Sequence, residues 1–167
     1  MGSTQTYAVT GGTISEIGAS LRRSAQAEGG FVGHYEARWR YRYDFSPIGQ
    51  SGCRLANVRI DLHSTIRIPQ WERPAPVADS VAAAWQRYID ALDDHEREHE
   101  RIAVNVAGDL VYALEQLREL SCEQLRVEAE RRAREFSNRM QEAQLQLDRD
   151  TRHGAATGAA WPPPARS

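Results

Sequence analysis

The sequence contains no lysine, so all 21 of its basic side chains are arginine. Set against 23 acidic residues, they leave a net charge of −2. A chain so close to neutrality is a poor candidate for a general binder of nucleic acid or of acidic membranes. Long hydrophobic runs are also absent, and none approaches the roughly 20 residues that a membrane-spanning helix needs. We therefore expect no nucleic-acid partner and no transmembrane segment.

Cysteine is scarce, with only Cys53 and Cys122 in the chain. A bridge between them would close a loop of about 70 residues and stabilise the fold by roughly 4 kcal/mol in the loop-entropy model. Two buried free thiols would leave the same spacing, so the sequence leaves both readings open. The opening stretch MGSTQTYAVTGG lacks a charged start followed by an apolar run, so no signal peptide is visible. A leading MGS is also what an expression tag leaves on a mature sequence.

The composition is that of an ordinary globular protein, with 41% hydrophobic and 26% charged residues. A chain of 167 residues is long enough for one domain with a real core. We expect this domain to span residues 1–160. The remaining residues, 161–167, are predicted to form a flexible proline-rich tail.

The first half of the sequence predicts strands. Residues 6–11 form a short strand in this interpretation, and a capping box at Thr13 and Glu16 begins a helix that ends near residue 27. Aromatic or apolar side chains alternate with charged ones over residues 34–45. Period two sends the aromatics to one face of a strand and the arginines to the other, which favours a core face over a base-stacking surface. Residues 46–52 are then the turn, and 53–69 the return strand of a hairpin.

The second half predicts an antiparallel pair of long helices. Apolar residues recur at three- and four-residue steps from Val81 to about Leu117, and a second capping pair, Ser121 and Gln124, starts another helix that ends near Asp148. The predicted fold class is α+β. We expect a small antiparallel β-sheet, built from the hairpin and the N-terminal strand, packed on this α-helical hairpin.

The chemistry concentrates in DDHEREHER, residues 93–101. His95, Glu96 and His99 match HExxH, the signature of zinc-dependent peptidases. Residues four apart on a helix lie about 6 Å apart on one face, so the two imidazoles can occupy two corners of a tetrahedral zinc site. Glu96 lies beside them, where it can take a proton from an activated water. Both histidines fall on the inward stripe of the helix, which a merely solvated charge run would not produce.

A catalytic zinc site needs a third protein ligand and an open fourth position. In the predicted helical hairpin, the end of the second helix lies opposite the motif, and the loop that follows can fold back carrying His153. Asp148 and Asp150 are competing donors. The two remaining histidines, His34 and His63, come from the strand hairpin and are weaker candidates. The alternative is that His95 and His99 are core or interfacial histidines that bind no metal and are satisfied by hydrogen bonds to carboxylates.

Six stretches together resemble a bacterial family of predicted secreted zinc-dependent proteases, domain of unknown function 922. They are YAVTGGTISEI, ARWRYRYDF, GCRLANVRIDLHSTIRIPQW, WQRYIDALDDHEREHERIA, SCEQL and LDRDTRHGAATGAAWP. The last is the most distinctive, because Thr-x-His-Gly is followed by small residues and an aromatic-proline pair. The chain departs from the family at Glu98, where Gly is common, and at Leu147, where Tyr is common. An acidic Glu98 would alter the charge near the site.

The resemblance implies a zincin-like active helix with one Zn²⁺ per chain, held by His95 and His99, with Glu96 as the catalytic base. It favours His153 as the third ligand. It also implies a disulfide between Cys53 and Cys122 and a secreted or periplasmic location.

We therefore expect a zinc metalloendopeptidase that acts on a peptide or protein substrate. Asp148, Arg152 and Arg67 are possible auxiliary residues, and the two arginines or a tyrosine could stabilise the oxyanion. By analogy with other HExxH enzymes, the strand ending at Pro69 would pair with the substrate. The alternative function is a non-catalytic binding module of the cell envelope, either stapled by zinc or free of metal.

Overall fold

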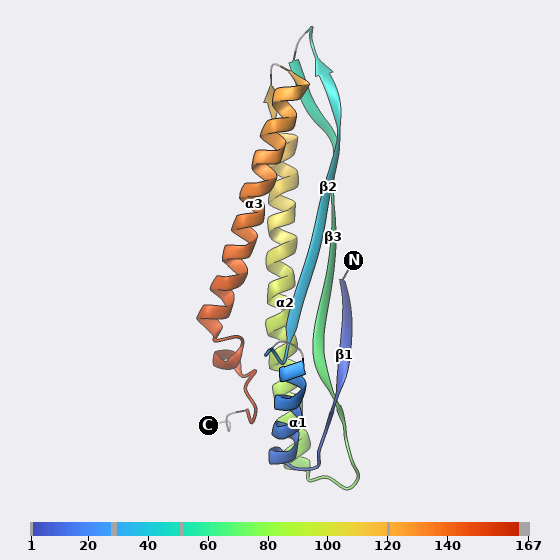
Figure 1. Ribbon diagram of the computed structural model, residues 1–167, viewed down its shortest axis with the longest axis vertical. Coiled ribbons are helices and arrows are strands. Elements are labelled where there is room, and N and C mark those ends of the chain that lie inside the picture. Colours follow the sequence, from blue (N-terminus) through green and yellow to red (C-terminus); the bar gives the residue numbers. More distant parts are fainter. Residues whose placement is uncertain (1, 28–29, 51, 120, 164–167) are drawn as a thin grey trace. The chain divides into compact units, whose positions relative to one another are not determined.

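The computed structural model describes residues 2–27, 30–50, 52–119 and 121–163, and its elements are shown in Figure 1. In chain order they are β1 (Gly2–Thr10), α1 (Ile14–Ala27), β2 (His34–Ile48), β3 (Gly52–Glu72), α2 (Asp79–Glu115), β4 (Arg118–Glu119), α3 (Cys122–Thr151) and a 3-10 helix (Ala155–Thr157). The predicted α+β class is confirmed. None of the helices in these ranges combines the length and apolar character that a membrane crossing requires.

The sheet is mixed, so the prediction of a purely antiparallel sheet was wrong. Its strand order is β1-β3-β2, and β4 also pairs with β3. β1 runs parallel to β3, from Gly2 opposite Ser64 to Thr10 opposite Glu72. β4 pairs with β3 in the antiparallel sense. A parallel pair needs a crossover connection, which α1 and β2 provide here. Hydrophobic periodicity could not reveal this pairing, because it reports the faces of a strand and not its neighbours.

The strand expected to pair with a substrate does not offer a free edge for it. β3 is the central strand of the order β1-β3-β2, and β1 occupies one of its edges along the whole stretch that contains Pro69. Substrate pairing by this strand stays a prediction, and the strand order does not favour it. An edge position belongs instead to β2, whose exposed and half-buried residues alternate as the sequence predicted.

The described chain forms two compact units. The first unit comprises Ala37–His63 and Arg101–Leu145, and the second comprises Gly2–Glu36, Ser64–Glu100 and the segment from Gln146 onward. Strands β2 and β3 and helices α2 and α3 each contribute residues to both units.

In the first unit, α3 runs alongside the later part of α2 (Figure 1). Its core contains Leu55 and Val58 of β3, Leu110 and Leu114 of α2, and Leu125 of α3. At one end of this core, Cys53 and Cys122 form a disulfide with a Cα–Cα distance of 5.1 Å. The bridge joins the start of β3 to the first residue of α3, which agrees with the pairing that the family resemblance implied.

In the second unit, α1 packs near the first part of α2 (Figure 1). The predicted capping box is present, because Glu16 N–H donates to Thr13 Oγ1 (3.2 Å) and Thr13 N–H donates to the Glu16 carboxylate (3.1 Å). The C-terminal segment is anchored by Trp161, whose indole N–H donates to the Ile14 carbonyl (2.9 Å) and whose ring lies edge-on to Trp85. Residues 164–167 of the predicted tail lie outside the described ranges.

Candidate metal centre

Helix α2 carries the HExxH residues on its buried face, as the inward stripe predicted. His95, Glu96 and His99 are 6%, 4% and 7% exposed. The charged neighbour Arg97 lies on the outside, where its guanidinium pairs with Asp93 across one turn (2.7 Å). Three ionisable side chains buried together on one helical face are unusual, because burial of polar groups costs free energy unless they find partners. The site must therefore supply partners for them.

Asp148, near the end of α3, is the partner that joins the two histidines. Its Oδ1 lies 3.3 Å from His95 Nε2 and 3.2 Å from His99 Nε2, and the two Nε2 atoms are 3.3 Å apart. The three donor atoms thus form a nearly equilateral triangle. His95, His99 and Asp148 make up a group that could hold a metal ion.

The triangle has the dimensions of one face of a tetrahedral zinc site. With metal–ligand distances near 2.0–2.1 Å, the donors at two corners of a tetrahedron are about 3.3 Å apart. All three observed separations match this value. Three protein donors and an open fourth corner are the arrangement of catalytic rather than structural zinc sites. The residues present therefore fit zinc in both donor type and spacing.

His153, the third ligand predicted from the sequence, reaches the group through Asp148. Its Nδ1 lies 3.2 Å from the same Asp148 Oδ1, and its side chain is 62% exposed. The Phe31 ring lies 5.8 Å from the His153 ring. The structure brings His153 to the site, but the third member of the donor triangle is the half-buried Asp148. A histidine that contacts a ligating carboxylate is well placed to orient it.

A tight turn after α3 positions this segment. Arg152, His153 and Gly154 follow one another with φ values of 52°, 52° and 79°, in the left-handed region that only glycine adopts at no steric cost. The turn is held by His153 N–H donating to the Asp148 carbonyl (2.9 Å) and Gly154 N–H donating to Thr151 Oγ1 (3.1 Å). Backbone strain of this kind clusters at functional sites.

Gly154 permits the turn to pass close over the metal group. A Cβ at this position would lie 3.0 Å from His95 Cγ and 2.9 Å from Ala159 Cβ. The glycine of the His-Gly pair is therefore needed for space as well as for its backbone conformation.

Glu96 is buried beside the donor group in a pocket that Gly33 leaves open. A Cβ at Gly33 would overlap the Glu96 carboxylate and lie 2.7 Å from Leu92 Cδ1. Burial raises the pKa of Glu96 to about 7, and the nearby charges of Asp148 and Asp93 add to the effect. A carboxyl group with a pKa near neutrality can both accept and return a proton.

The surroundings of His95 favour its neutral imidazole form. Burial lowers the pKa of His95, and the neighbouring His99 lowers it further, while Asp148 acts in the opposite direction. The Tyr35 ring stacks on His99 with 6.0 Å between ring centroids and 10° between the ring planes. Neutral imidazole is the form that binds a metal ion.

The other residues that the sequence singled out do not belong to the donor triangle of His95, His99 and Asp148. The Asp150 carboxylate accepts a hydrogen bond from Gln146 (2.7 Å), and the His34 ring stacks on Phe31. The Arg67 guanidinium lies over the Tyr7 ring, and Arg152 is exposed in the tight turn. His63 belongs to the first unit, whereas the metal group lies in the second.

Sequence reasoning missed Gly33 and Tyr35 as neighbours of the site. Gly33 precedes a strand and carries no motif that marks it, so only its position against Glu96 reveals a role. Tyr35 belongs to the aromatic face of β2, for which periodicity predicts core packing. Periodicity alone cannot show that one of these rings stacks on His99. The signal for Gly154 was present in the His-Gly pair of the most distinctive stretch.

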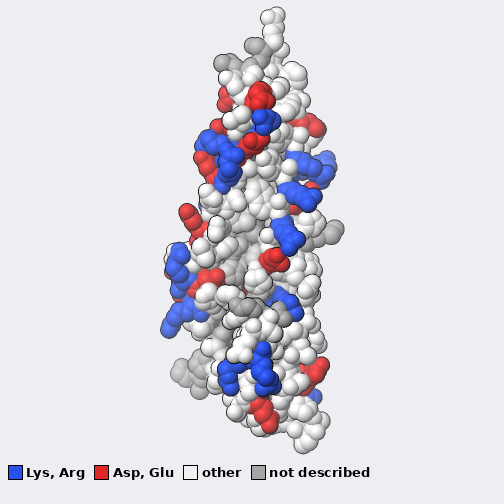
Figure 2. Space-filling model, in the orientation of Figure 1, with Lys and Arg blue, Asp and Glu red and all other residues white. Residues whose placement is uncertain are grey.

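On the face shown in Figure 2, arginine and carboxylate side chains are interspersed rather than separated by sign.

A family model described as a bacterial protein of unknown function (DUF922) matches residues 4–154. No curated protein and no solved structure matches the chain. The family match spans both compact units and every residue of the donor triangle, so the chain belongs to the bacterial DUF922 family.

Proposed function

We propose that the protein is a zinc-dependent peptide hydrolase whose centre is the triangle formed by buried His95 and His99 and half-buried Asp148. The observation that carries the proposal is the spacing of the three donor atoms, at 3.2–3.3 Å, with the carboxylate of Glu96 buried on the adjacent helical position. Each separation taken singly also fits a hydrogen bond, so the support comes from the convergence of all three donor atoms at the edge length of a tetrahedral zinc site.

Each residue has a distinct task in this proposal. Zinc would supply Lewis-acid activation of a water molecule and of the scissile carbonyl. Glu96 accepts the proton of the attacking water and delivers it to the leaving amine. His95 and His99 hold the ion from α2, and Asp148 holds it from α3. His153 orients the Asp148 carboxylate through its Nδ1 contact.

The disulfide supports an exported location for this activity. Disulfides persist in oxidising compartments, such as the bacterial periplasm and the medium, and are rare in the cytosol. The Cys53–Cys122 bridge closes a loop with a sequence separation of 69 residues. We therefore place the protein outside the cytoplasm, in the periplasm or secreted.

Replacement of Glu96 by Gln separates binding from catalysis. The parent protein and the Glu96→Gln variant are loaded with one equivalent of zinc, and metal content is measured after desalting. Cleavage is then followed by mass spectrometry on an unfolded protein substrate. We expect both proteins to retain zinc, because Glu96 is not a donor. Cleavage by the variant should fall by about 10³-fold, because general acid–base catalysis contributes on this scale.

A second candidate function rests on the fact that the donor group joins two helices. His95 and His99 come from α2 and Asp148 from α3, so a bound metal ion would staple the end of α3 to α2 in the second unit. If the metal ion has only this structural role, the parent protein and the Glu96→Gln variant would both bind zinc and neither would cleave the substrate. Removal of zinc would then only lower the stability of the fold. Failure of both proteins to bind zinc would overturn both functions.

A further inference from the structure

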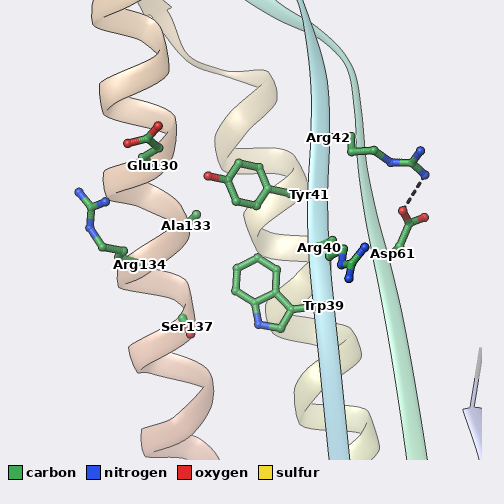
Figure 3. A pocket seen from close by; sticks show the side chains of 9 residues that line it. All are labelled: Trp39, Arg40, Tyr41, Arg42, Asp61, Glu130, Ala133, Arg134 and Ser137. Carbon is green, nitrogen blue, oxygen red and sulfur yellow. Dashed lines mark hydrogen bonds and ion pairs between the residues drawn. The ribbon is translucent and has the colours of Figure 1, made fainter.

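The first unit contains a groove that the proposed hydrolase does not use. It has a volume of about 820 Å³ and lies between β2 and α3, as Figure 3 shows. Its lining residues are Trp39, Arg40, Tyr41, Arg42, Asp61, Glu130, Ala133, Arg134 and Ser137. The volume falls within the range of ligand sites, and aromatic lining with a few polar groups is typical of them.

The floor of the groove is the aromatic face of β2. The rings of Trp39 and Tyr41 point toward α3, where Ala133 and Ser137 present small side chains (Figure 3). The two rings are 6.1 Å apart, and Tyr43 extends the row at 6.0 Å from Tyr41. The small residues on α3 leave room above the rings for apolar side chains of another chain.

The opposite face of β2 carries arginine. Arg40 and Arg42 point away from α3 (Figure 3), and both are exposed. Arg42 pairs with Asp61 at 2.6 Å, whereas Arg40 has no ion-pair partner among the described residues. On the α3 side, Glu130 and Glu123 both pair with Arg126. Among the groove-lining residues of β2, the charge left unpaired is therefore the positive charge of Arg40.

β2 is also an edge strand, because it ends the order β1-β3-β2. An edge strand presents unpaired backbone N–H and C=O groups that can accept another extended chain. Successive side chains of such a chain would point to opposite faces of the sheet. Those on one face would meet Trp39 and Tyr41, and those on the other would meet Arg40 and Arg42.

We propose that this groove binds an extended peptide in which apolar and acidic residues alternate, added as a strand to the free edge of β2. The apolar residues fill the space over the aromatic rings, and the acidic residues pair with the arginines. A second copy of β2 is a poor occupant, because its own arginines would lie against Arg40 and Arg42, and like charges directly opposite are destabilising. This site is independent of the metal centre.

The test uses the full chain and a fluorescently labelled octapeptide that alternates valine and glutamate. Binding is measured by fluorescence anisotropy against two control peptides, one with lysine in place of glutamate and one with the glutamates grouped together. We expect saturable binding of the alternating acidic peptide and at least tenfold weaker binding of both controls. Equal binding of the lysine or grouped peptide, or no saturable binding of any peptide, would overturn the proposal.

Two protein variants and a control locate the site. Arg40→Glu should weaken binding at least tenfold by reversing the charge, and Ser137→Trp should do the same by filling the groove from an exposed position on α3. Arg22→Glu, on α1 in the second unit, makes the same charge change elsewhere and should bind as the parent does. Unchanged binding in both groove variants would place the peptide at another site and contradict the proposal.

Strand addition makes a further demand on the peptide backbone. Only one edge of the added strand pairs with β2. Only alternate amide N–H groups of the peptide therefore donate hydrogen bonds to β2. N-methylation of all valine amides and N-methylation of all glutamate amides should therefore have opposite results, with one peptide binding normally and the other losing binding. Equal behaviour of the two peptides would exclude strand addition. A concentration-dependent dimer that the peptide dissociates would show that a second copy is the native occupant instead.

Discussion

At the scale of single residues, the site depends on one carboxylate oxygen. Asp148 Oδ1 lies within 3.3 Å of the ring nitrogens of three histidines, His95, His99 and His153. Two of these histidines are buried and one is largely exposed. This difference in burial is why we assign His95 and His99 to the metal and His153 to the support of Asp148.

Asp148→Asn and His153→Ala should weaken zinc binding to different extents. Loss of the charged donor should lower the affinity by more than about 100-fold, whereas loss of an outer partner of a ligand typically costs 10–100-fold. Zinc affinity measured by competition with a chelating dye compares the two variants. His34→Ala, which removes another histidine that contacts Phe31, is the control and should bind as the parent does. A larger loss in His153→Ala than in Asp148→Asn would make His153 the direct ligand.

Gly33→Ala should reduce hydrolysis without removing zinc. The new Cβ would overlap the buried Glu96 carboxylate, which must then shift away from the reacting water. We expect at least a tenfold fall in the cleavage rate at unchanged zinc affinity. Gly108→Ala is the matched control, because nothing lies within 4 Å of a Cβ there. Alanine should even stabilise that helical position by about 1 kcal/mol. Normal cleavage by Gly33→Ala would show that the Glu96 carboxylate tolerates the shift.

At the scale of elements, the turn after α3 determines where Asp148 and His153 lie. α3 ends at Thr151, and the chain reverses through three residues with positive φ before the 3-10 helix Ala155–Thr157. The Trp161 hydrogen bond to Ile14 then ties the segment to the start of α1. The turn is therefore held at both ends, which fixes its position against α2.

Gly154→Ala should weaken both the fold and the metal site. A non-glycine residue at φ 79° is strained by about 1 kcal/mol, and its Cβ would push against the His95 ring. We expect lower unfolding free energy in urea and at least tenfold weaker zinc binding. Gly158→Ala separates the two effects, because it introduces similar strain at φ 108° but meets only Ala91. It should lose stability and keep its zinc affinity. Equal loss of zinc in both variants would mean that strain alone disturbs the site.

At the scale of the whole molecule, the stabilising covalent link and the candidate metal centre belong to different compact units. The disulfide joins β3 to α3 in the first unit, and the donor group lies in the second. The two cores share no buried residue among those that the structure describes. Opening the disulfide should therefore lower stability without disturbing metal binding.

The double variant Cys53→Ser, Cys122→Ser tests this separation. Opening the loop should lower the unfolding free energy by about 4 kcal/mol, if the loss of chain entropy accounts for the whole effect. Urea denaturation measures this change. Zinc affinity, measured on the folded variant below its unfolding transition, should stay within twofold of the parent value. A large fall in zinc affinity would show that the donor group depends on the bridge.

Local patterns predicted the long strands, the three helices and the HExxH part of the site, but not β4 or the 3-10 helix. The alternation over 34–45 and the helical stripe from Val81 follow from backbone geometry, which repeats every two residues in a strand and every 3.6 in a helix. For the same reason, helical periodicity is enough to assign the HExxH histidines to one buried face of a helix. The family stretches added the pairing of Cys53 with Cys122, which the structure contains.

The sequence by itself therefore determined the approximate positions of the two long strands and the three helices, the buried faces of the aromatic strand and of the first long helix, and that His95, Glu96 and His99 lie together. Only the tertiary structure decided that β1 runs parallel to β3, that β2 is the edge strand, that Asp148 completes the donor triangle, and that Gly33 lies against Glu96. Each of these features joins residues that are far apart in the chain. Their proximity depends on the path of the whole backbone, which no local period encodes.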